Sequence, residues 1–513
     1  MLKSTQEYRE SLRAYSPRVF INGEQVAAVA DDPRLRPGIN AVGVTYDFAA
    51  RPEHAELMLA HGRGLDEGDD RAVNRMLHIN RHAEDLLRKL EAVRLVCRES
   101  GCAQRYLAHD ALNAIFQTTH VGKERDGTEY HDRFLHYLED VQDRDLSLGI
   151  AMTDGKGERN LGPHQQPVKD AYVHVSERRA DGIVIRGVKA IVTGAPYMHE
   201  LLVMPCRAMT AEADDYAVCC AVPIDAAGLT IVSRPAGRPG QAGARFSNRY
   251  GQCTAVCVFE DVFVPWDRVF MAGEWDLTSE LVNGYAAHHR HSCIGARAGF
   301  GDLLLGAGAL MADANGLDQA LHPHIREGMV ELIKIVEGFF ACGVAASVYG
   351  VEGSSGCWQP EPVFANIGKL LLATQIYDMH RVAHEVSGGL IVALPGPDED
   401  HNPHTKGDLD TLLRGRSDVP YGQRMDIARF IEDITASDTG GWYSVISLHG
   451  GGSPQAMKRE IHRRYPIEER QQLVRKLLER DALAATESGA PRRRRQPGQC
   501  CPTGCRAKTL PDR

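Results

Sequence analysis

The stretch "YVHVSERRADGIVIRGVKAIVTGA", residues 172–195, decides the class of fold. Short runs of β-branched residues alternate there with turn residues, and "ADGI" supplies a tight turn, so we expect residues 183–194 to form a hairpin. The strand pattern continues at regular intervals in four further segments: 201–206, 216–224, 229–234 and 253–265. Because no helical pattern alternates with these segments, the region predicts a compact antiparallel β domain and not a doubly wound nucleotide-binding sheet.

Helical periodicity lies on both sides of this region. Apolar residues at three- and four-residue spacing predict a helix within 74–97, further helices at 111–122 and 129–145, and a short strand-like opening at 18–26. Long helical patterns return at 301–316, 326–350 and 363–389. We therefore predict an α+β fold. Its parts are an N-terminal helical domain (1–145), a middle β domain (146–275), a C-terminal helix bundle (276–485) and a disordered tail (486–513).

The composition limits the classes of function. The chain has 513 residues and a net charge of −9, which argues against a nucleic-acid binder. The start "MLKSTQEYRE" has no apolar core of a signal peptide, and no apolar run approaches the length of a membrane span. With no export signal, the 13 cysteines indicate reduced thiols. We expect a cytoplasmic protein that acts on a small molecule.

Five stretches in order carry a family resemblance. They are "YRESLRAYSPRVFINGEQV" (8–26), "AMTDGKGER" (151–159), "GIVIRGVKAIVTGA" (182–195), "VFEDVFVPWDRVF" (258–270) and "LHGGGSPQAM" (448–457). Together they resemble the 4-hydroxyphenylacetate 3-hydroxylase / 4-hydroxybutyryl-CoA dehydratase family of flavoproteins, and most of all its dehydratase branch. The resemblance implies the acyl-CoA dehydrogenase fold, a homotetramer, and FAD in a groove between the β domain and the bundle.

The resemblance also implies which residues contact the flavin. Met152, Thr153 and Asp154 match one flavin-contacting segment of the family, and Thr193 with Gly194 matches a second. Backbone N–H groups and a threonine hydroxyl can stabilise the negative charge of a reduced flavin. The resemblance further implies two glycine-rich loops that approach the cofactor of a neighbouring subunit. Their glycines are Gly388, Gly389, Gly450 and Gly451. A simple turn or a helix C-cap is the alternative for these segments.

The stretch "GYAAHHRHSCIGARAG", residues 284–299, looks like a metal site, and the resemblance gives it a meaning. The dehydratase branch holds a [4Fe–4S] cluster with three cysteines and one histidine, whose positions match Cys102, Tyr106, His289 and Ala296 here. Two of the four ligands are therefore lost, and alanine cannot bind iron. Cys97, five residues before Cys102, would face away from it on a helix.

We therefore expect no iron–sulfur cluster and no metal. One alternative is a rewired site with three ligands, Cys102, His289 and Cys293, in which the last two are one helical turn apart. The resemblance also places two glutamates of the dehydratase branch at Ile446 and Thr254, so both carboxylate bases are missing.

With the flavin segments kept and the cluster lost, the chemistry of the other branch is favoured. We predict a monooxygenase that uses O2 and reduced flavin from a separate reductase to hydroxylate a small, aromatic substrate. The predicted pocket residues are His289, Arg105, Tyr106 and His109. One alternative is a dehydratase-like, isomerase or dehydrogenase flavoenzyme that acts on an acyl-CoA thioester, with His289 as the base. A catalytically inactive relative is the other alternative.

Overall fold

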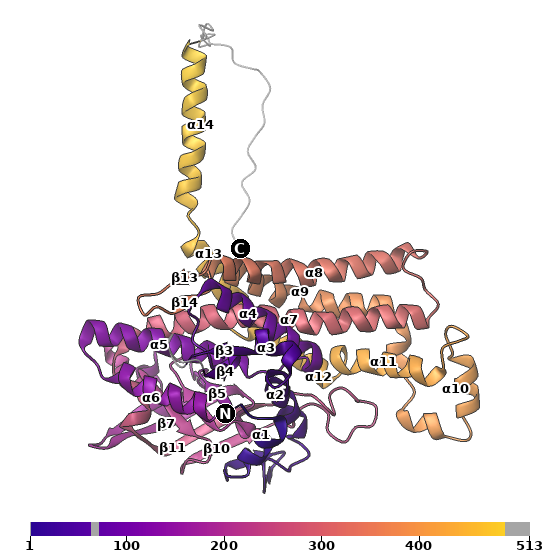
Figure 1. Cartoon of the computed structure of the whole chain (residues 1–513), viewed down its shortest axis with the longest axis horizontal. Helices are drawn as coiled ribbons and strands as arrows, with labels where there is room; N and C mark the ends of the chain where they lie inside the picture. Colours follow the sequence, from indigo (N-terminus) through magenta and orange to yellow (C-terminus); the bar gives the residue numbers. More distant parts are fainter. Residues whose placement is uncertain (1, 63–70, 488–513) are drawn as a thin grey trace, which may run out of the picture. The chain divides into compact units, whose positions relative to one another are not determined.

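The computed structural model describes residues 2–62 and 71–487. The chain divides into two units, residues 1–463 and 464–513. The second unit contributes helix α14 (Ile467–Glu487). The predicted disordered tail, residues 486–513, differs at its start, because residues 486–487 are helical, and residues 488–513 lie outside the described residues. Within the first unit, helices and strands follow the predicted order of helical, β and helical segments, which confirms the α+β class (Figure 1). The domain boundaries themselves remain a prediction.

The N-terminal part is mainly helical. Its helices are α1 (Thr5–Leu12), α2 (Arg36–Ala49), α3 (Ala55–Met58), α4 (Ala83–Ser100), α5 (Tyr106–Asp126) and α6 (Tyr130–Asp143). Strands β3 (Leu59–His61) and β4 (Ala72–Asn74) form a small hairpin. Helix α4 begins nine residues after the start of the periodicity at 74–97 and ends at Ser100, because the next residue, Gly101, has a φ of +68° that breaks the helix.

Two sheets form the middle part. Six strands take the order β2-β1-β10-β11-β7-β6, and four take the order β12-β9-β8-β5. Their bounds are β1 (Arg18–Ile21), β2 (Glu24–Gln25), β5 (Leu148–Ala151), β6 (His174–Arg178), β7 (Gly182–Thr193), β8 (Glu200–Val203), β9 (Val218–Pro223), β10 (Leu229–Ser233), β11 (Thr254–Pro265) and β12 (Val269–Ala272). The predicted strands are thus present at all four further segments.

Two details differ from the prediction. Residues 183–194 do not form a hairpin but belong to the single long strand β7, which pairs with β6 on one side and β11 on the other. Irregularities in this pairing let β7 bend without turning back. The sheets are also not purely antiparallel, because β1 pairs parallel to β10 and β5 pairs parallel to β8. The N-terminal strand thereby ties the first part to the β part.

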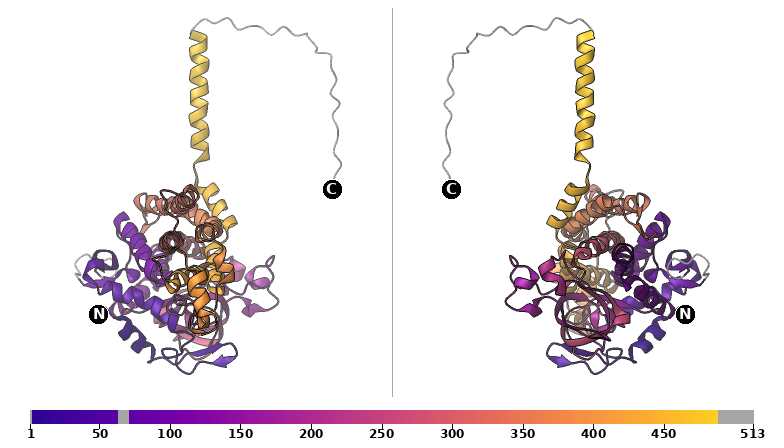
Figure 2. Two further views of the ribbon diagram at one scale, coloured as in Figure 1. Left: turned by 90° about the vertical axis from the view of Figure 1, so that its right-hand side faces the viewer. Right: turned by 90° about the vertical axis from the view of Figure 1, so that its left-hand side faces the viewer.

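Long helices make up the C-terminal part of the first unit. They are α7 (Thr278–Ala314), α8 (Pro323–Val348) and α9 (Pro362–Ser387), which pack along one another (Figure 2), followed by α10 (Lys406–Leu412), α11 (Tyr421–Thr435), α12 (Asp438–His449) and α13 (Pro454–Arg464). A short hairpin, β13 (Val351–Glu352) with β14 (Trp358–Gln359), connects α8 to α9. Helix α7 is long and apolar enough to cross a membrane, but 61% of its apolar window is buried inside the protein, as in a core helix.

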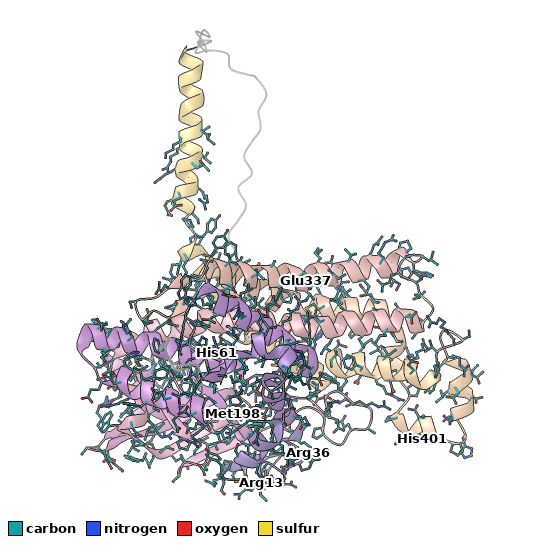
Figure 3. The ribbon with its side chains drawn as sticks, viewed as in Figure 1. Arg13, Arg36, His61, Met198, Glu337 and His401 are labelled. Atoms are coloured by element: carbon teal, nitrogen blue, oxygen red, sulfur yellow. The ribbon has the colours of Figure 1, made fainter. Side chains whose placement is uncertain are left out.

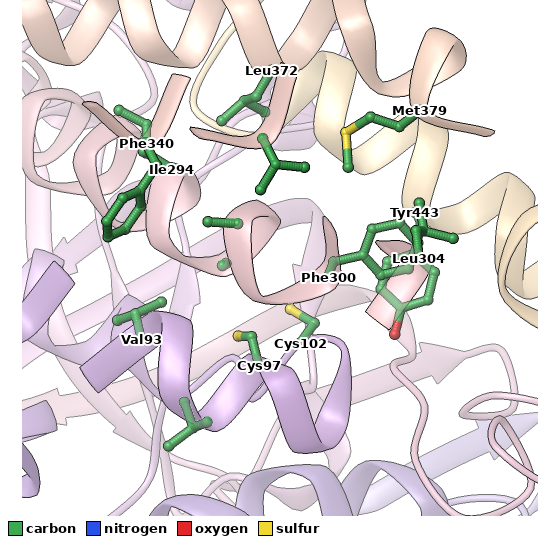
Figure 4. Packing of buried hydrophobic residues seen from close by; sticks show 14 of the residues in the cluster. Val93, Cys97, Cys102, Ile294, Phe300, Leu304, Phe340, Leu372, Met379 and Tyr443 are labelled. Carbon is green, nitrogen blue, oxygen red and sulfur yellow. The ribbon is translucent and has the colours of Figure 1, made fainter. Parts of the chain in front are cut away.

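The largest apolar core joins the first and last parts of this unit. Val93 and Cys97 of α4 pack beneath Ile294 and Phe300 of α7, with Leu372 of α9 on the far side of α7 (Figure 4). Charged side chains such as Arg13 and Glu337 lie at the surface, whereas Met198 is buried (Figure 3). Helix α7 is therefore the central element against which the other helices pack, and its side chains are held in fixed positions.

Candidate active site

A small cavity opens where five elements meet. It lies between the loop before α5, the end of β7, and helices α7, α9 and α12, and its volume is about 50 Å³. This space holds only a few water molecules, so a larger ligand must displace lining side chains. The lining residues are Cys102, Gln104, Tyr106, Leu107, Thr193, His289, Cys293, Ala296, Arg297, Lys369, Leu372, Trp442, Ile446, Ser447 and Gly450.

The cavity brings several predicted site residues together. His289, Tyr106, Thr193 and Gly450 all line it, from segments as far apart as residues 106 and 450. The other predicted residues do not line it: Arg105, His109, Met152, Thr153, Asp154, Gly194, Gly388, Gly389 and Gly451. Gly451 nevertheless lies beside His289, because a Cβ built on it would be 3.3 Å from the Cδ2 atom of the imidazole ring.

His289 is held by a chain of polar contacts. Its Nδ1 is 3.2 Å from a carboxylate oxygen of Asp110, and its Nε2 is 3.6 Å from the Sγ of Cys293. The imidazole also stacks between the rings of Tyr106 and Tyr285. Burial on its own lowers the pKa of His289, but Cys293 and Asp110 raise it to about 9. Burial raises the pKa of the Cys293 thiol, whereas the charge and hydrogen bond of His289 lower it to about 7.

Asp110 is the residue that holds this series of polar contacts in place. It is fully buried and accepts hydrogen bonds from Ser292 and from Lys89, whose Nζ lies 3.4 Å away. Lys89 also donates to Ser292 at 2.7 Å. Burial raises the pKa of Asp110, but the charge of Lys89 and the hydrogen bonds of the histidines hold it well below its usual value. Asp110 and Lys89 were not predicted from the sequence, although each is a charged residue among the buried positions of its helix, α5 and α4, which is a signal of buried pairing.

Cationic side chains dominate the cavity wall. Arg297 is 5% exposed, donates from Nε to Ser447 at 2.5 Å, and leaves its buried Nη1 without a partner. Lys369 donates to the Ser447 carbonyl, and burial lowers its pKa to about 8. None of the described residues that line the cavity is Asp or Glu. The wall therefore presents positive charge and an open hydrogen-bond donor, which together suit an anionic ligand.

Arg105 and His109 lie away from this wall. The Arg105 guanidinium is fully buried, pairs with Asp145, donates to the Leu146 carbonyl at 3.0 Å and lies 4.0 Å from the centre of the Tyr46 ring. His109 is 3.0 Å from the Asn80 side chain, and burial lowers its pKa to about 4. The geometry of α5 explains the difference, because successive residues of a helix point in different directions: Tyr106 and Leu107 line the cavity, whereas Arg105 and His109 do not.

The two predicted flavin-contacting segments lie side by side. Ala190 N–H donates to the Thr153 carbonyl at 2.7 Å, and Asp154 bridges to Lys189. The Asp154 carboxylate itself is buried and bound by Lys189 and by the Val173 N–H, so it fixes the segment.

Gly194 follows the end of β7 and has a φ of +72°, and a Cβ there would overlap the side-chain amide of Gln104. Thr193, Gly194 and Gln104 form one corner of the cavity region. That amide donates from Nε2 to the Thr193 carbonyl at 2.6 Å, while its buried Oε1 has no partner. The corner therefore needs glycine and keeps an unsatisfied polar atom at the cavity edge.

An apolar patch extends from this corner along the sheet. Thr193 pairs with Thr254 across β7 and β11, and Val256 pairs with Val232 further on. Val256 and Val232 are exposed, as is Ile191, whose side chain is 57% exposed and whose φ is +61°. A β-branched residue in this region is strained, and such outliers cluster at ligand sites. Polar threonines beside an exposed apolar patch fit the edge and the face of a flavin ring.

The residues do not fit an iron–sulfur cluster. Tyr106 and Ala296, which stand at the lost ligand positions, both line the cavity together with Cys102 and His289, and alanine offers no donor atom. Within the part of the chain that the structure describes, no group of three or more His, Cys, Asp or Glu is placed to hold a metal ion. Ile446, the predicted replacement of a glutamate, also lies in the wall.

The argument that Cys97 faces away from Cys102 is wrong. Helix α4 ends at Ser100, so Cys102 is not on the same helix, and both thiols point into the same core beneath α7 (Figure 4). The Cys102 Sγ instead lies 3.6 Å from the Tyr106 hydroxyl.

Buried neutral histidines predict acid lability. Burial lowers the pKa of His131 to about 4 and that of His199 to about 3, as it does for His109. Because the unfolded chain binds these protons near pH 6.5, stability falls as the pH drops from 7 towards 4, by up to about 1.4 kcal/mol per pH unit for each histidine.

We expect the thermal midpoint to fall between pH 7 and pH 5. His131→Gln should flatten this slope, whereas His404→Gln, at an exposed position, should not change it. A midpoint that is constant from pH 7 to pH 5 would contradict the prediction.

The chain is similar to known proteins over most of its length. The family profile "4-hydroxyphenylacetate 3-hydroxylase N terminal" matches residues 4–271, and the profile "4-hydroxyphenylacetate 3-hydroxylase C terminal" matches residues 278–479. The chain is 34% identical to a 4-hydroxybutyryl-CoA dehydratase/vinylacetyl-CoA-Δ-isomerase of Clostridium aminobutyricum, over 93% of this chain and 99% of the relative. It is 25% identical to a 4-hydroxyphenylacetate 3-monooxygenase oxygenase component of Thermus thermophilus, over 93% and 98%.

Solved structures share the fold. An oxygen-tolerant archaeal 4-hydroxybutyryl-CoA dehydratase from N. maritimus superposes with a TM-score of 0.89 at 34% identity, covering 93% of this chain and 95% of the other. An oxygenase component of 4-hydroxyphenylacetate 3-monooxygenase complexed with FAD superposes with a TM-score of 0.81 at 22% identity, covering 94% and 99%.

Proposed function

Since the chain belongs to the 4-hydroxyphenylacetate 3-hydroxylase family, we propose that it is a flavin-dependent monooxygenase that hydroxylates a small phenolic substrate. The observation that carries the proposal is the cationic wall. Arg297, Lys369 and His289 line the cavity with no carboxylate among the described lining residues. These charges lower the pKa of a bound phenol and favour the phenolate, which is the electron-rich form that accepts an electrophilic oxygen. A reaction that abstracts a proton next to a carbonyl needs a general base, and no described residue of this wall is a carboxylate that could serve as one.

The cofactor is FAD, bound along the corner of Thr193 and Gly194. Three features support it: the adjacent segments 152–154 and 191–194, the unpartnered Gln104 Oε1, and the apolar patch of Ile191, Val256 and Val232. Reduced FAD, when bound, would supply two electrons to O2, and O2 would supply the oxygen atom that is transferred to the substrate. The chain's own residues hold the phenolate oxygen at Arg297 and exclude water by their close packing.

The wider setting follows from the relatives. The Thermus thermophilus protein is named an oxygenase component, which implies a second component, and we propose a separate flavin reductase as the partner of this chain. A homotetramer and a cytoplasmic location complete the proposal.

A second candidate is a flavoenzyme that acts on an acyl-CoA thioester. Two observations favour it: the 34% identity to a dehydratase, and the contact of His289 with Asp110, which orients an imidazole that can act as a base. Against it stand Ile446 and Ala296 in the wall, where a glutamate and a cluster cysteine would be needed.

The decisive experiment compares the two directly. The purified protein is first examined by anaerobic absorption spectroscopy, with iron and acid-labile sulfide assayed on the same sample. It is then mixed with chemically reduced FAD, O2 and a panel of phenols, and in parallel with acyl-CoA thioesters. We expect bound flavin, no stoichiometric iron, and phenol-dependent O2 consumption with a hydroxylated product.

Two results would reject the monooxygenase. Stoichiometric iron and sulfide would indicate an iron–sulfur cluster and would make a dehydratase the favoured function. A shift of the flavin spectrum with acyl-CoA, without hydroxylated product from any phenol, would favour the second candidate. Bound flavin with neither response would indicate an inactive relative.

A further inference from the structure

Three side chains form a line along one face of α7. His289, Cys293 and Arg297 follow one another at four-residue steps, so they lie one helical turn apart, and all three line the cavity. Cys293 is the middle member, and its thiol contacts the His289 Nε2 at 3.6 Å. Its side chain is only half-buried, whereas His289 and Arg297 are almost fully enclosed.

The line has the parts of a nucleophilic site. A nucleophile needs an adjacent base, and the base needs a third group that orients it. Here the carboxylate of Asp110 contacts the Nδ1 of His289 at 3.2 Å, opposite the nitrogen that contacts Cys293. Asp110 cannot turn away, because Ser292 and Lys89 hold its other oxygen inside the core.

A site for developing negative charge lies on the other side of the thiol. Arg297 Nη1 is buried without a partner, although its Nε is held by Ser447. A buried, unpartnered guanidinium N–H points to a ligand oxygen, and one turn of helix separates it from the sulfur. Lys369 adds a second positive charge to the same wall. Nucleophile, base and oxyanion donor are thus present in one cavity.

We propose that Cys293 is a nucleophile that adds reversibly to an anionic α,β-unsaturated carbonyl compound. In the forward step, a bond forms between the Cys293 sulfur and the β-carbon, and the π electrons of the C=C bond move onto the carbonyl oxygen. Arg297 stabilises the resulting enolate. The α-carbon then takes a proton from the His289 imidazolium, which received it from the thiol. No oxidant, reductant or leaving group is required.

Conjugate addition suits this cavity better than acyl transfer. A thiolate is a soft nucleophile, and the cationic wall stabilises an enolate. Acyl transfer would need a leaving group to depart and a second step in which water releases the acyl group, whereas conjugate addition needs neither. The site does not depend on flavin, so it extends beyond the proposed monooxygenase and can fail or hold independently of it. The lowered pKa of Cys293 agrees with the geometry.

The test uses a matched pair of small enones. 4-Oxo-2-pentenoate carries a carboxylate, and 3-penten-2-one is its neutral counterpart. The full-length protein, as purified, is incubated with each, and adducts are mapped and timed by peptide mass spectrometry. Cys342 on α8, a half-buried cysteine whose thiol pKa is raised by burial, serves as the internal control.

We expect Cys293 to react with the anionic enone at least about tenfold faster than Cys342, because it has more thiolate and a cationic wall. The neutral enone should show a smaller preference. Cys293→Ser should remove the adduct, and His289→Asn and Arg297→Met should each slow it. Asp110→Asn is less informative, since it leaves the buried Lys89 without its carboxylate.

Three outcomes would overturn the proposal. One is a Cys293 rate no greater than that of Cys342. Another is an unchanged rate in both His289→Asn and Arg297→Met, with thermal midpoints that show folded proteins. The third is an adduct that forms first on Cys102, the other cysteine of the cavity wall.

Discussion

Arg297→Met is expected to lower kcat/KM for the hydroxylated phenol by about 10²- to 10³-fold, the usual effect of removing a donor to a developing or bound oxyanion. The Arg297 Nη1 is buried and unpartnered within the protein, so its hydrogen bond goes to the substrate in the proposed reaction. Methionine keeps most of the side-chain volume and removes the charge. The measurement is steady-state O2 consumption and product formation with the phenol that the panel selects.

The same substitution should not weaken the fold. Arg297 is 5% exposed and has no ion pair with a described carboxylate, so its charge is costly to bury. We expect the free energy of unfolding to stay the same or to rise by about 1 kcal/mol. This combination of lost activity and kept stability separates a substrate-binding role from a structural one.

Arg94→Met is the matched control for this prediction. Arg94 is also largely buried, but it pairs with Asp302 at 2.8 Å and with Glu337, away from the cavity. Its replacement should lower the thermal midpoint and leave kcat/KM unchanged. Equal losses of activity in both variants, or an unfolded Arg297→Met protein, would contradict the assignment of Arg297 to the substrate.

Local patterns predicted most of the fold. The strands at 201–206, 216–224, 229–234 and 253–265 formed where alternation and turn residues indicated them, because each buries one face. The predicted hairpin in 183–194 was wrong, and Gly187 stands in the middle of this segment. In the structure it lies in mid-strand with a φ of +126°, where a Cβ would collide with the Tyr172 backbone. A glycine in a sequence can indicate either a turn or the close approach of two backbones, and the sequence alone does not distinguish them.

The residues of the site could be predicted only where they belong to a motif that resembles the family. Tyr106 and His289 were predicted as pocket residues and Thr193 as a flavin contact, and all three line the cavity. Lys369 comes from a helix with an ordinary apolar pattern, and nothing in its local sequence indicates that it faces a cavity. Arg105 is the converse case, because its buried pair with Asp145 depends on the packing of two distant segments.

Gly194→Ala is expected to reduce the FAD content of the purified protein to a small fraction of that of the wild type. The residue adopts a φ of +72°, which costs a side chain about 1 kcal/mol. A Cβ there would also overlap the Gln104 amide that holds the Thr193 carbonyl, so the corner must shift. A shift of about 1 Å in a positioning segment is enough to lose most of a ligand's binding. Flavin content is measured by absorbance after denaturation.

Gly127→Ala separates the effect of the positive φ from the effect of the overlap with Gln104. Gly127 has a similar φ of +68°, at the end of α5, but a Cβ there meets no atom within 4 Å. It should therefore lose a comparable amount of stability from backbone strain and keep its flavin. Thr193→Ala, which removes a hydroxyl from the cavity wall, should also weaken FAD binding, by about 1 kcal/mol for one hydrogen bond. Unchanged flavin content in both Gly194→Ala and Thr193→Ala would remove FAD from this corner, because no other described segment joins the cavity to the sheet in the same way.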